Sequence, residues 1–363
     1  MKRSASCYID LLAAREHPRP TYFRKSRAND GMSLRMTRDI GSSLAARCLT
    51  DAHFPELPGF YRGKVRDTYR LPDDRQVMIA TDRQSAFDQV LAAVPYKGQV
   101  LNQTARFWFE ATSDICPNHV ISYPDPNVVI ARHLTMLPIE MIVRDYLTGS
   151  TETSIWTMYA RGGRLLYGHE FPDGLQKNQK LPDTILTPTT KAVQGERDEP
   201  ITAEEIVTRN LLSQAQWDAV AEISMKLFQR GREIATRQGL ILVDTKYEFG
   251  LDGDGGIVVA DELHTPDSSR FWKQANYEER LAAGQEPEGL DKEFLRLWVT
   301  ARCDPYKDPV PEIPEETLRE FSDKYIALYE TVTGQAFAYG ADGEPIGERV
   351  RKNLARALPE FFS

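Results

Sequence analysis

"LVDTKYEFG" (residues 242–250) has the apolar character of a buried β-strand, yet it contains an acid, a base and a second acid. Successive side chains of a strand point to opposite faces of the sheet, so Asp244, Lys246 and Glu248 share one face. The residues between them form the other face. A row of three charges within an apolar strand requires a structural or a chemical explanation.

A hairpin is predicted directly after this strand. The Asp-Gly dipeptides of "LDGDGG" favour a turn, and the apolar stretch "IVVADE" follows as a second strand. We centre the turn on Gly253-Asp254. Lys246 then lies opposite Asp261, and Glu248 lies one diagonal away from Asp261. Diagonal neighbours are about 7–8 Å apart, so the two carboxylates could bind one cation, whereas a register slip of one residue would move Asp261 to the other face.

This charged hairpin has two interpretations. The simpler one is a solvated face with a cross-strand Lys–Asp ion pair. Apolar flanking residues favour an interior position instead, and the next segment, "ELHTPDSSRFW", adds Ser268, Ser269 and Arg270 as a candidate phosphate or oxyanion cradle. Mg²⁺ typically takes one or two carboxylates together with substrate phosphate oxygens. The segment therefore favours Mg²⁺-nucleotide chemistry.

The composition is that of a globular, acidic protein. Its 363 residues are 41% hydrophobic and 27% charged, and the net charge is −8, which disfavours broad nucleic-acid binding. No apolar run is long enough to cross a bilayer, so no membrane association is expected. The four cysteines form no CxxC pair, which favours reduced thiols and a cytoplasmic location.

We predict an α+β fold with two lobes after an N-terminal extension. Residues 1–50 are expected to be a basic, flexible extension or an over-long start; a transit peptide is the alternative, but its acidic residues argue against it. Residues 51–137 are predicted as a β-rich nucleotide-binding lobe and 138–363 as a larger α+β lobe with the hairpin and the C-terminal helices.

Several secondary-structure elements can be placed within these lobes. Hydrophobic periodicity predicts helices within 100–113, 202–239 and 314–334. A hairpin is predicted around the turn "PDDR". Two further strands are predicted with a break between them at Pro138, and residues 181–200 are predicted as a long functional loop.

Two segments before the hairpin carry further candidate residues. "GKVRD" places Lys64 and Arg66 on one strand face, where they could contact nucleotide phosphates, although the motif is not a Walker A loop and a surface strand with paired charges is the alternative. "TDRQSAFD" places Asp82, Ser85 and Asp88 at a strand end, where active-site loops often begin; Asp82 could equally cap a helix.

Two more segments lie between these and the charged strand. "IVRDYLTGS" combines Arg144 with Ser150 as a possible phosphate site, or Arg144 pairs structurally with Asp145. "TPTTK" presents Lys191, which could reach a transferring phosphoryl group or could simply be solvated.

Six segments follow one another along the chain in this order: "YRGKVRDTY", "TDRQSAFD", "EMIVRDYLTGS", "LPDTILTPTTKA", "GLILVDTKYEFG" and "DELHTPDSSRFW". Together they resemble the SAICAR synthetase family, from about residue 55 to the C-terminal helix. The resemblance implies a two-lobed fold with an ATP-grasp- or kinase-like nucleotide site between the lobes. It implies that ATP and Mg²⁺ are used to join L-aspartate to the carboxylate of 5-amino-1-(5-phosphoribosyl)imidazole-4-carboxylate (CAIR) in purine biosynthesis. The products would be SAICAR, ADP and phosphate, formed through an acyl phosphate.

The resemblance also implies roles for individual residues. Glu248 and Asp261 would hold Mg²⁺. The nucleotide would be contacted by Lys64, Arg66, Met136, Glu140 and Lys191. CAIR would be bound by Arg144, Ser150, Asp267, Ser269 and Arg270, and the catalytic residues would be Asp88, Lys191 and Lys246.

One departure from the family pattern and several alternatives stay open. Where the family often has His-Asp-Glu, this chain has Arg197-Asp198-Glu199, which leaves Asp198 as a candidate substrate contact. The loops near Asp198 and Ser85 are candidates for binding L-aspartate. A small-molecule kinase on the same scaffold and a non-catalytic nucleotide-binding module are the alternative functions. A monomer and a homodimer are both possible.

Overall fold

The computed structural model describes residues 48–191, 198–339 and 344–362, all of which belong to the unit Ser43–Ser363. The predicted N-terminal extension, apart from residues 48–50, lies outside the described residues. The two-lobe division stays a prediction; strand β8 (Thr135–Leu147) crosses the expected boundary after residue 137.

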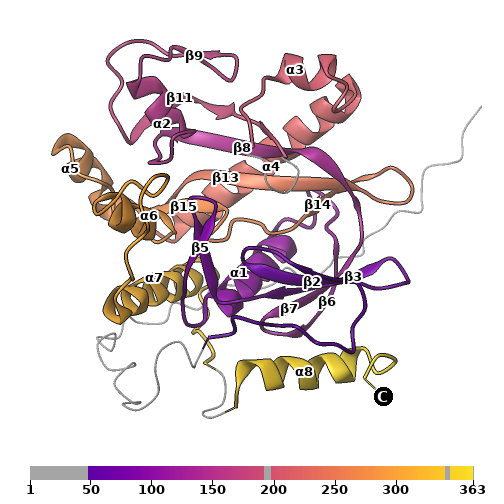
Figure 1. Ribbon diagram of the computed structural model, residues 1–363. Coiled ribbons are helices and arrows are strands. Elements are labelled where there is room, and N and C mark those ends of the chain that lie inside the picture. The colour runs from indigo at the N-terminus through magenta and orange to yellow at the C-terminus, as the bar shows by residue number, and fades with distance from the viewer. Residues whose placement is uncertain (1–47, 192–197, 340–343, 363) are drawn as a thin grey trace, which may run out of the picture. The chain divides into compact units, whose positions relative to one another are not determined.

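The first sheet holds the predicted nucleotide segment. Its five antiparallel strands run in the order β1-β2-β3-β7-β6, and they are β1 (Phe60–Arg62), β2 (Arg66–Arg70), β3 (Arg75–Ala80), β7 (Val128–Arg132) and β6 (Val120–Asp125). Figure 1 labels four of them, β2, β3, β6 and β7. The predicted hairpin is confirmed, with Arg66 opposite Ala80. The Gly63 N–H donates to the Arg66 carbonyl at 2.8 Å, so a turn separates β1 from β2 where we expected one continuous strand.

The second sheet contains the charged strand at its centre. Strand β13 (Leu240–Leu251) pairs with β8, β14 and β15, and β8 pairs also with β11 and β12. The outer strands are β11 (Gln179–Leu186), β12 (Thr189–Thr190), β14 (Ile257–Ala260) and β15 (Ser269–Lys273). The predicted long loop over 181–200 is therefore largely wrong, because β11 and β12 occupy its described part up to residue 190.

The expected strand break at Pro138 is also wrong. Pro138 lies inside β8, while β7 and β8 are separated at residues 133–134. Proline has no N–H to donate to a neighbouring strand. The β8–β13 register shifts between Glu248 and Gly250, beside Pro138, so the ladder is already interrupted where the donor is missing.

Helices cover the sheets with apolar faces. Helix α4 (Gln214–Arg237) packs on β13 and β8, and its Leu227 and Phe228 join Tyr247 and Phe249 in the largest buried cluster. The remaining described helices are α1 (Lys97–Ala111), α2 (Ile155–Ala160), α3 (Ala203–Thr208), α5 (Tyr277–Ala282), α6 (Glu293–Thr300), α7 (Glu315–Thr333), α8 (Ile346–Ala357) and the 3₁₀ helix η2 (Gln274–Asn276).

Local sequence signals explain several helix positions. Helix α3 starts with a capping box, in which Thr202 and the N3 residue Glu205 bond reciprocally. Helix α1 packs on α7, and α8 packs on β6 beneath the first sheet's apolar residues. Two short hairpins complete the fold: β4 (Arg83–Ala86) with β5 (Gln89–Ala93), and β9 (Leu165–Leu166) with β10 (His169–Glu170).

Candidate active site

Strand alternation builds the charged face as predicted. On β13, Tyr247 and Phe249 enter the buried core, so Lys246 and Glu248 lie on the opposite face. Glu140 of β8 is directly opposite Glu248, and Arg144 of β8 is directly opposite Asp244. Two neighbouring strands therefore present five ionisable side chains on one face.

The predicted hairpin register is wrong by one residue. Glu248 is opposite Ala260, and Leu251 is opposite Ile257, which leaves a five-residue turn. The carboxylate of Asp252 accepts the Gly256 N–H at 2.8 Å and so stabilises this longer turn. Asp261 comes after the end of β14 and has a left-handed φ of 60°, so strand alternation no longer determines its direction.

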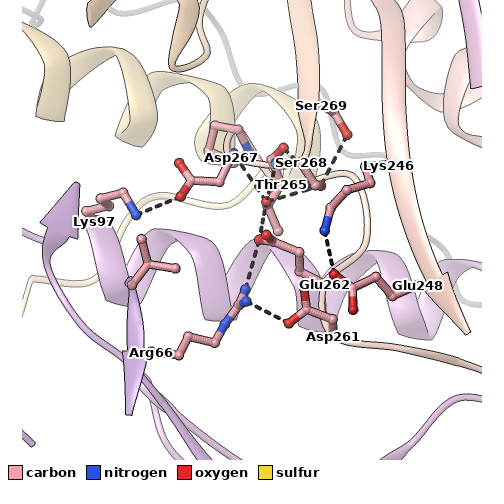
Figure 2. A network of polar contacts seen from close by, with 12 residues as sticks. Arg66, Lys97, Lys246, Glu248, Asp261, Glu262, Thr265, Asp267, Ser268 and Ser269 are labelled. Carbon is pink, nitrogen blue, oxygen red and sulfur yellow. Dashed lines mark hydrogen bonds and ion pairs between the residues drawn. The ribbon is translucent and has the colours of Figure 1, made fainter. Parts of the chain in front are cut away.

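Glu248 and Asp261 nevertheless both face cations in the same region (Figure 2). The Glu248 side chain is 9% exposed and forms ion pairs with Lys191 and Lys246. Asp261 accepts a hydrogen bond from Arg66 at 2.7 Å. Burial alone would raise the pKa of Glu248, but Lys246 and Lys191 hold it well below its usual range. Glu248 is therefore ionised at neutral pH.

Lys246 is a permanent cation at the centre of the site. Its ammonium donates to Glu140 at 2.8 Å and also contacts Glu248. Burial alone would lower the pKa of Lys246, but the carboxylates of Glu248, Glu140 and Asp261 raise it well above its usual range. Lys246 can neutralise a developing negative charge but cannot serve as a general base at neutral pH.

The predicted nucleotide residues divide between the interior and the surface. Arg66 is largely buried and bridges Asp261 and Glu262. Lys64 and Asp88 pair with each other at 3.0 Å in an exposed position. Met136 is 37% exposed near the start of β8, four residues before Glu140. Asp88 does not line the cavity described next, and its catalytic role stays a prediction.

A cavity of about 250 Å³ lies beside the charged face. It brings together seven predicted site residues: Glu140, Arg144, Asp198, Lys246, Asp267, Ser269 and Arg270. Arg270 donates to Asp244 at 2.6 Å and to Glu293 at 3.2 Å, while Arg144 donates to Thr187 at 2.8 Å. Burial alone would raise the pKa of Glu293. The positive charges of Arg270 and Arg296, together with a hydrogen bond from the Ser150 side chain, lower it to about 2.

Several donors at this cavity have no hydrogen-bond partner in the part of the chain that the structure describes. Nε of Arg270, Nε of Arg296 and the Thr189 hydroxyl are buried, and none of these three atoms has a partner there. All three residues line the cavity. Leaving a buried donor unpaired costs roughly 1–3 kcal/mol, and more where the donor is charged. An anionic ligand in this cavity would supply acceptors for these groups.

A polar chain connects the nucleotide segment with the substrate loop (Figure 2). Arg66 contacts Glu262 at 2.9 Å, and the Thr265 hydroxyl donates to the same Glu262 oxygen at 2.5 Å. The Thr265 N–H bonds Ser268, and Ser269 bonds Thr245 of β13 at 2.7 Å. Residues 261–269 are thereby held between the two sheets.

Sequence reasoning missed residues contributed by distant helices. Lys97, at the start of α1, is fully buried and donates to Asp267 at 2.8 Å, while Tyr325 of α7 donates to the other Asp267 oxygen at 2.6 Å. Asp291, Lys292 and Arg296 line the cavity at the start of α6. The spacing of Lys292 and Arg296 by four residues indicates one helical face, but nothing local links that face to residues 244–270.

Asp291 is held by the backbone on both sides. Its carboxylate accepts the N–H groups of Phe271 at 2.9 Å and of Glu293 at 2.8 Å. Burial raises its pKa to about 7, with Arg270 and these N–H groups opposing that rise. Asp291 therefore positions the start of α6 against β15.

No helix among the described residues has both the length and the apolar character needed to span a membrane.

The chain is similar to known proteins along most of its length. A family model described as SAICAR synthetase matches residues 59–313. A protein of Mesorhizobium japonicum named putative phosphoribosylaminoimidazole-succinocarboxamide synthase 2 is 55% identical over 85% of this chain and 99% of its own. A phosphoribosylaminoimidazole-succinocarboxamide synthase of Legionella pneumophila is 53% identical over 86% of this chain and 99% of its own.

A solved structure is similar in fold as well as in sequence. The SAICAR synthase of Saccharomyces cerevisiae, described as complexed with SAICAR, has a TM-score of 0.68 and 31% sequence identity. The match covers 80% of this chain and all of that one. The predicted family is thus confirmed together with the α+β fold: the chain belongs to the SAICAR synthetase family.

Proposed function

We propose that the protein joins L-aspartate to the carboxylate of CAIR, with ATP converted to ADP and phosphate, in purine biosynthesis. The observation that carries the proposal is the cavity at the charged face, where buried donors without partners lie beside an ionised Glu248 and a permanently charged Lys246. Relatives at least 50% identical carry the name of this synthase, and a 31% identical relative is described with SAICAR bound.

The guanidinium groups at the cavity suit the CAIR phosphate. Arg144 and Arg270 have fixed orientations, because each is held by Asp244. Arginine matches phosphate geometry with two parallel donors, and Nε of Arg270 has no hydrogen-bond partner among the described residues. We assign the CAIR phosphate to Arg144, Arg270 and Ser150, and the imidazole end to Asp267, Ser269 and Asp198.

The nucleotide is assigned to the turn between β1 and β2 of the first sheet and to the start of β8. Lys64 lies in that turn and Arg66 begins β2; both would contact ATP phosphates, as would Lys191. Met136 and Glu140, on one strand, would hold adenine and ribose. ATP would replace surface pairs such as Lys64–Asp88, which solvent screens.

Mg²⁺ fits the residues that are present. Glu248 and Asp261 are two partly buried carboxylates whose present partners are all cations, and Mg²⁺ typically takes one or two carboxylates plus phosphate oxygens. When bound, Mg²⁺ would neutralise charge on the ATP phosphates.

The proposed reaction has two steps, and each step forms one bond and breaks another. A CAIR carboxylate oxygen attacks the γ-phosphorus of ATP, the bond to the bridging oxygen breaks, and ADP leaves. The amine of L-aspartate then attacks the acyl carbon, the bond from that carbon to the phosphorylated oxygen breaks, phosphate leaves, and the amine proton passes to solvent. Lys246 and Lys191 neutralise charge during phosphoryl transfer, which depends mainly on positioning and electrostatics.

ADP formation with each substrate omitted tests this function. We expect ADP only when CAIR and L-aspartate are both present, and one ¹⁸O from labelled CAIR carboxylate in the released phosphate. ADP formation that needs no aspartate would support a small-molecule kinase instead. ATP binding without any ADP formation would support a binding module.

The cytoplasm is the proposed location. The described cysteines Cys116 and Cys303 are free thiols, which suit a reducing compartment.

A further inference from the structure

The cations of the cavity differ in whether they have a counter-ion. Arg144 and Arg270 contact Asp244, Arg296 contacts Glu293, and Lys246 contacts Glu140. Lys292 lines the same cavity. Among the described residues, no carboxylate oxygen lies within 4.0 Å of the Lys292 ammonium.

Asp267, the acid that most favours the charged form of Lys292, is already occupied. Its two oxygens accept hydrogen bonds from Lys97 and Tyr325. The Lys292 N–H donates to the Pro266 carbonyl at 3.3 Å, which fixes its backbone beside Asp267. Lys292 is thus held next to a carboxylate whose charge Lys97 already neutralises.

A partly buried ammonium without a counter-ion is energetically unfavourable. Burial lowers the pKa of Lys292 to about 8; Arg296 and Lys97 lower it further, while Asp267 and Glu262 oppose this. Burying a charge is tolerated where it is paired, so a ligand carboxylate beside Lys292 would stabilise its charged form.

The three anionic ligands of the reaction need separate cations. The guanidinium pair on Asp244 suits the CAIR phosphate, and Lys191 and Lys246 lie at the nucleotide side with Glu248. We propose that Lys292 binds a carboxylate of L-aspartate and so makes the enzyme specific for a dicarboxylic amine. This inference rests on the proposed function and places a residue at the aspartate subsite, which the sequence left open.

Lys292→Met removes the charge and keeps most of the side-chain volume. We expect the KM for L-aspartate to rise on the order of 10- to 100-fold, the range for losing one charge-assisted hydrogen bond, while the KM values for CAIR and ATP stay within about threefold. Lys292→Arg should retain part of the affinity. Lys226→Met is the matched control, because Lys226 is an exposed lysine paired with Glu222 on α4.

Substrate analogues give a readout that a merely structural role would not change. The wild-type enzyme should discriminate against L-asparagine and against L-isoasparagine, each of which lacks one carboxylate charge. In Lys292→Met the preference for L-aspartate over one of these two analogues should fall at least tenfold. The analogue affected identifies the carboxylate that Lys292 contacts. Unchanged discrimination against both, with an unchanged aspartate KM, overturns the inference.

Succinate is a dicarboxylate without an amine, so the pH dependence of its binding reports the protonation of Lys292 and not that of the substrate amine. Succinate should compete with L-aspartate, and its inhibition should weaken above about pH 8 in the wild type, as Lys292 loses its proton, but not in Lys292→Met. The same pH dependence in both proteins contradicts the inference. Should Lys292→Met fail to fold by circular dichroism, Lys292→Gln replaces it. A wild-type enzyme that forms no amide refutes the proposed function itself, which is a separate result.

Discussion

Arg144 and Arg270 lie on opposite sides of strand β13 and donate to the same oxygen, Oδ2 of Asp244, each at 2.6 Å. Both are opposite Asp244 in the sheet, Arg144 on β8 and Arg270 on β15. One buried carboxylate therefore orients two guanidinium groups toward the same cavity. Because two cations share one anion, the group keeps a net positive charge for an anionic ligand.

Asp244→Asn should destabilise the protein. The change leaves two largely buried guanidinium groups without their shared anion, and breaking a buried pair costs about 3 kcal/mol or more. Urea denaturation should show this loss, and added inorganic phosphate should restore more stability in the variant than in the wild type. Asp114→Asn is the control, because Asp114 pairs with Arg230 at an exposed position and should cost less than about 1 kcal/mol. Equal losses in both variants would argue against the shared-anion role.

Arg270→Ala should mainly impair CAIR binding. The proposed phosphate contact is charge-assisted, so we expect the KM for CAIR to rise about 10- to 100-fold, with little change in the KM for ATP. Arg270→Lys should recover only part of the affinity, because lysine lacks the planar fork. Steady-state kinetics with Arg209→Ala, which changes an exposed arginine at the C-cap of α3, provide the reference. An unchanged CAIR KM removes Arg270 from the phosphate site.

Local rules account for the parts of this site that the sequence predicted. The period of two places Asp244, Lys246 and Glu248 on one face whatever the strand pairs with, and the structure has them there. The capping box at Thr202 and Glu205 likewise depends only on neighbouring residues.

Two kinds of property were missed: the length of a turn held by one of its own side chains, and contacts between segments far apart in the sequence. The hairpin register differs because Asp252 supports a five-residue turn, which the Asp-Gly pattern does not specify. Lys97 reaches Asp267 across 170 positions of sequence, so only the folded helix packing brings them together. Lys292 has no local pattern that separates it from a solvated lysine.

Glu248→Gln and Asp261→Asn should lower turnover by weakening Mg²⁺ binding. At limiting Mg²⁺ we expect turnover to fall about 10- to 100-fold, and we expect it to recover partly as the Mg²⁺ concentration is raised. Calorimetric titration of Mg²⁺ in the presence of a non-hydrolysable ATP analogue gives a readout independent of activity. Glu222→Gln, an exposed glutamate on α4, should behave as the wild type. Normal amide synthesis by both variants at limiting Mg²⁺ would refute this assignment.

His119 should make the protein sensitive to acid. The ring is buried, and neither of its nitrogens has a hydrogen-bond partner within residues 48–191, 198–339 and 344–362. Burial lowers the pKa of His119 to about 4, although Asp261 opposes this. The unfolded chain then binds a proton near pH 6.5 that the native protein does not bind until about pH 4. The stability contribution is therefore complete above pH 6.5 and is lost as the pH falls toward 4, at roughly 1 kcal/mol per pH unit.

The His119→Phe variant lacks the ring that takes up this proton on unfolding. Its urea midpoint should therefore fall less between pH 7.5 and pH 5 than that of the wild type. Exposed His53, changed to Gln, is the control and should leave the pH dependence unaltered. If His119→Phe and the wild type lose stability in parallel on acidification, another group binds the proton.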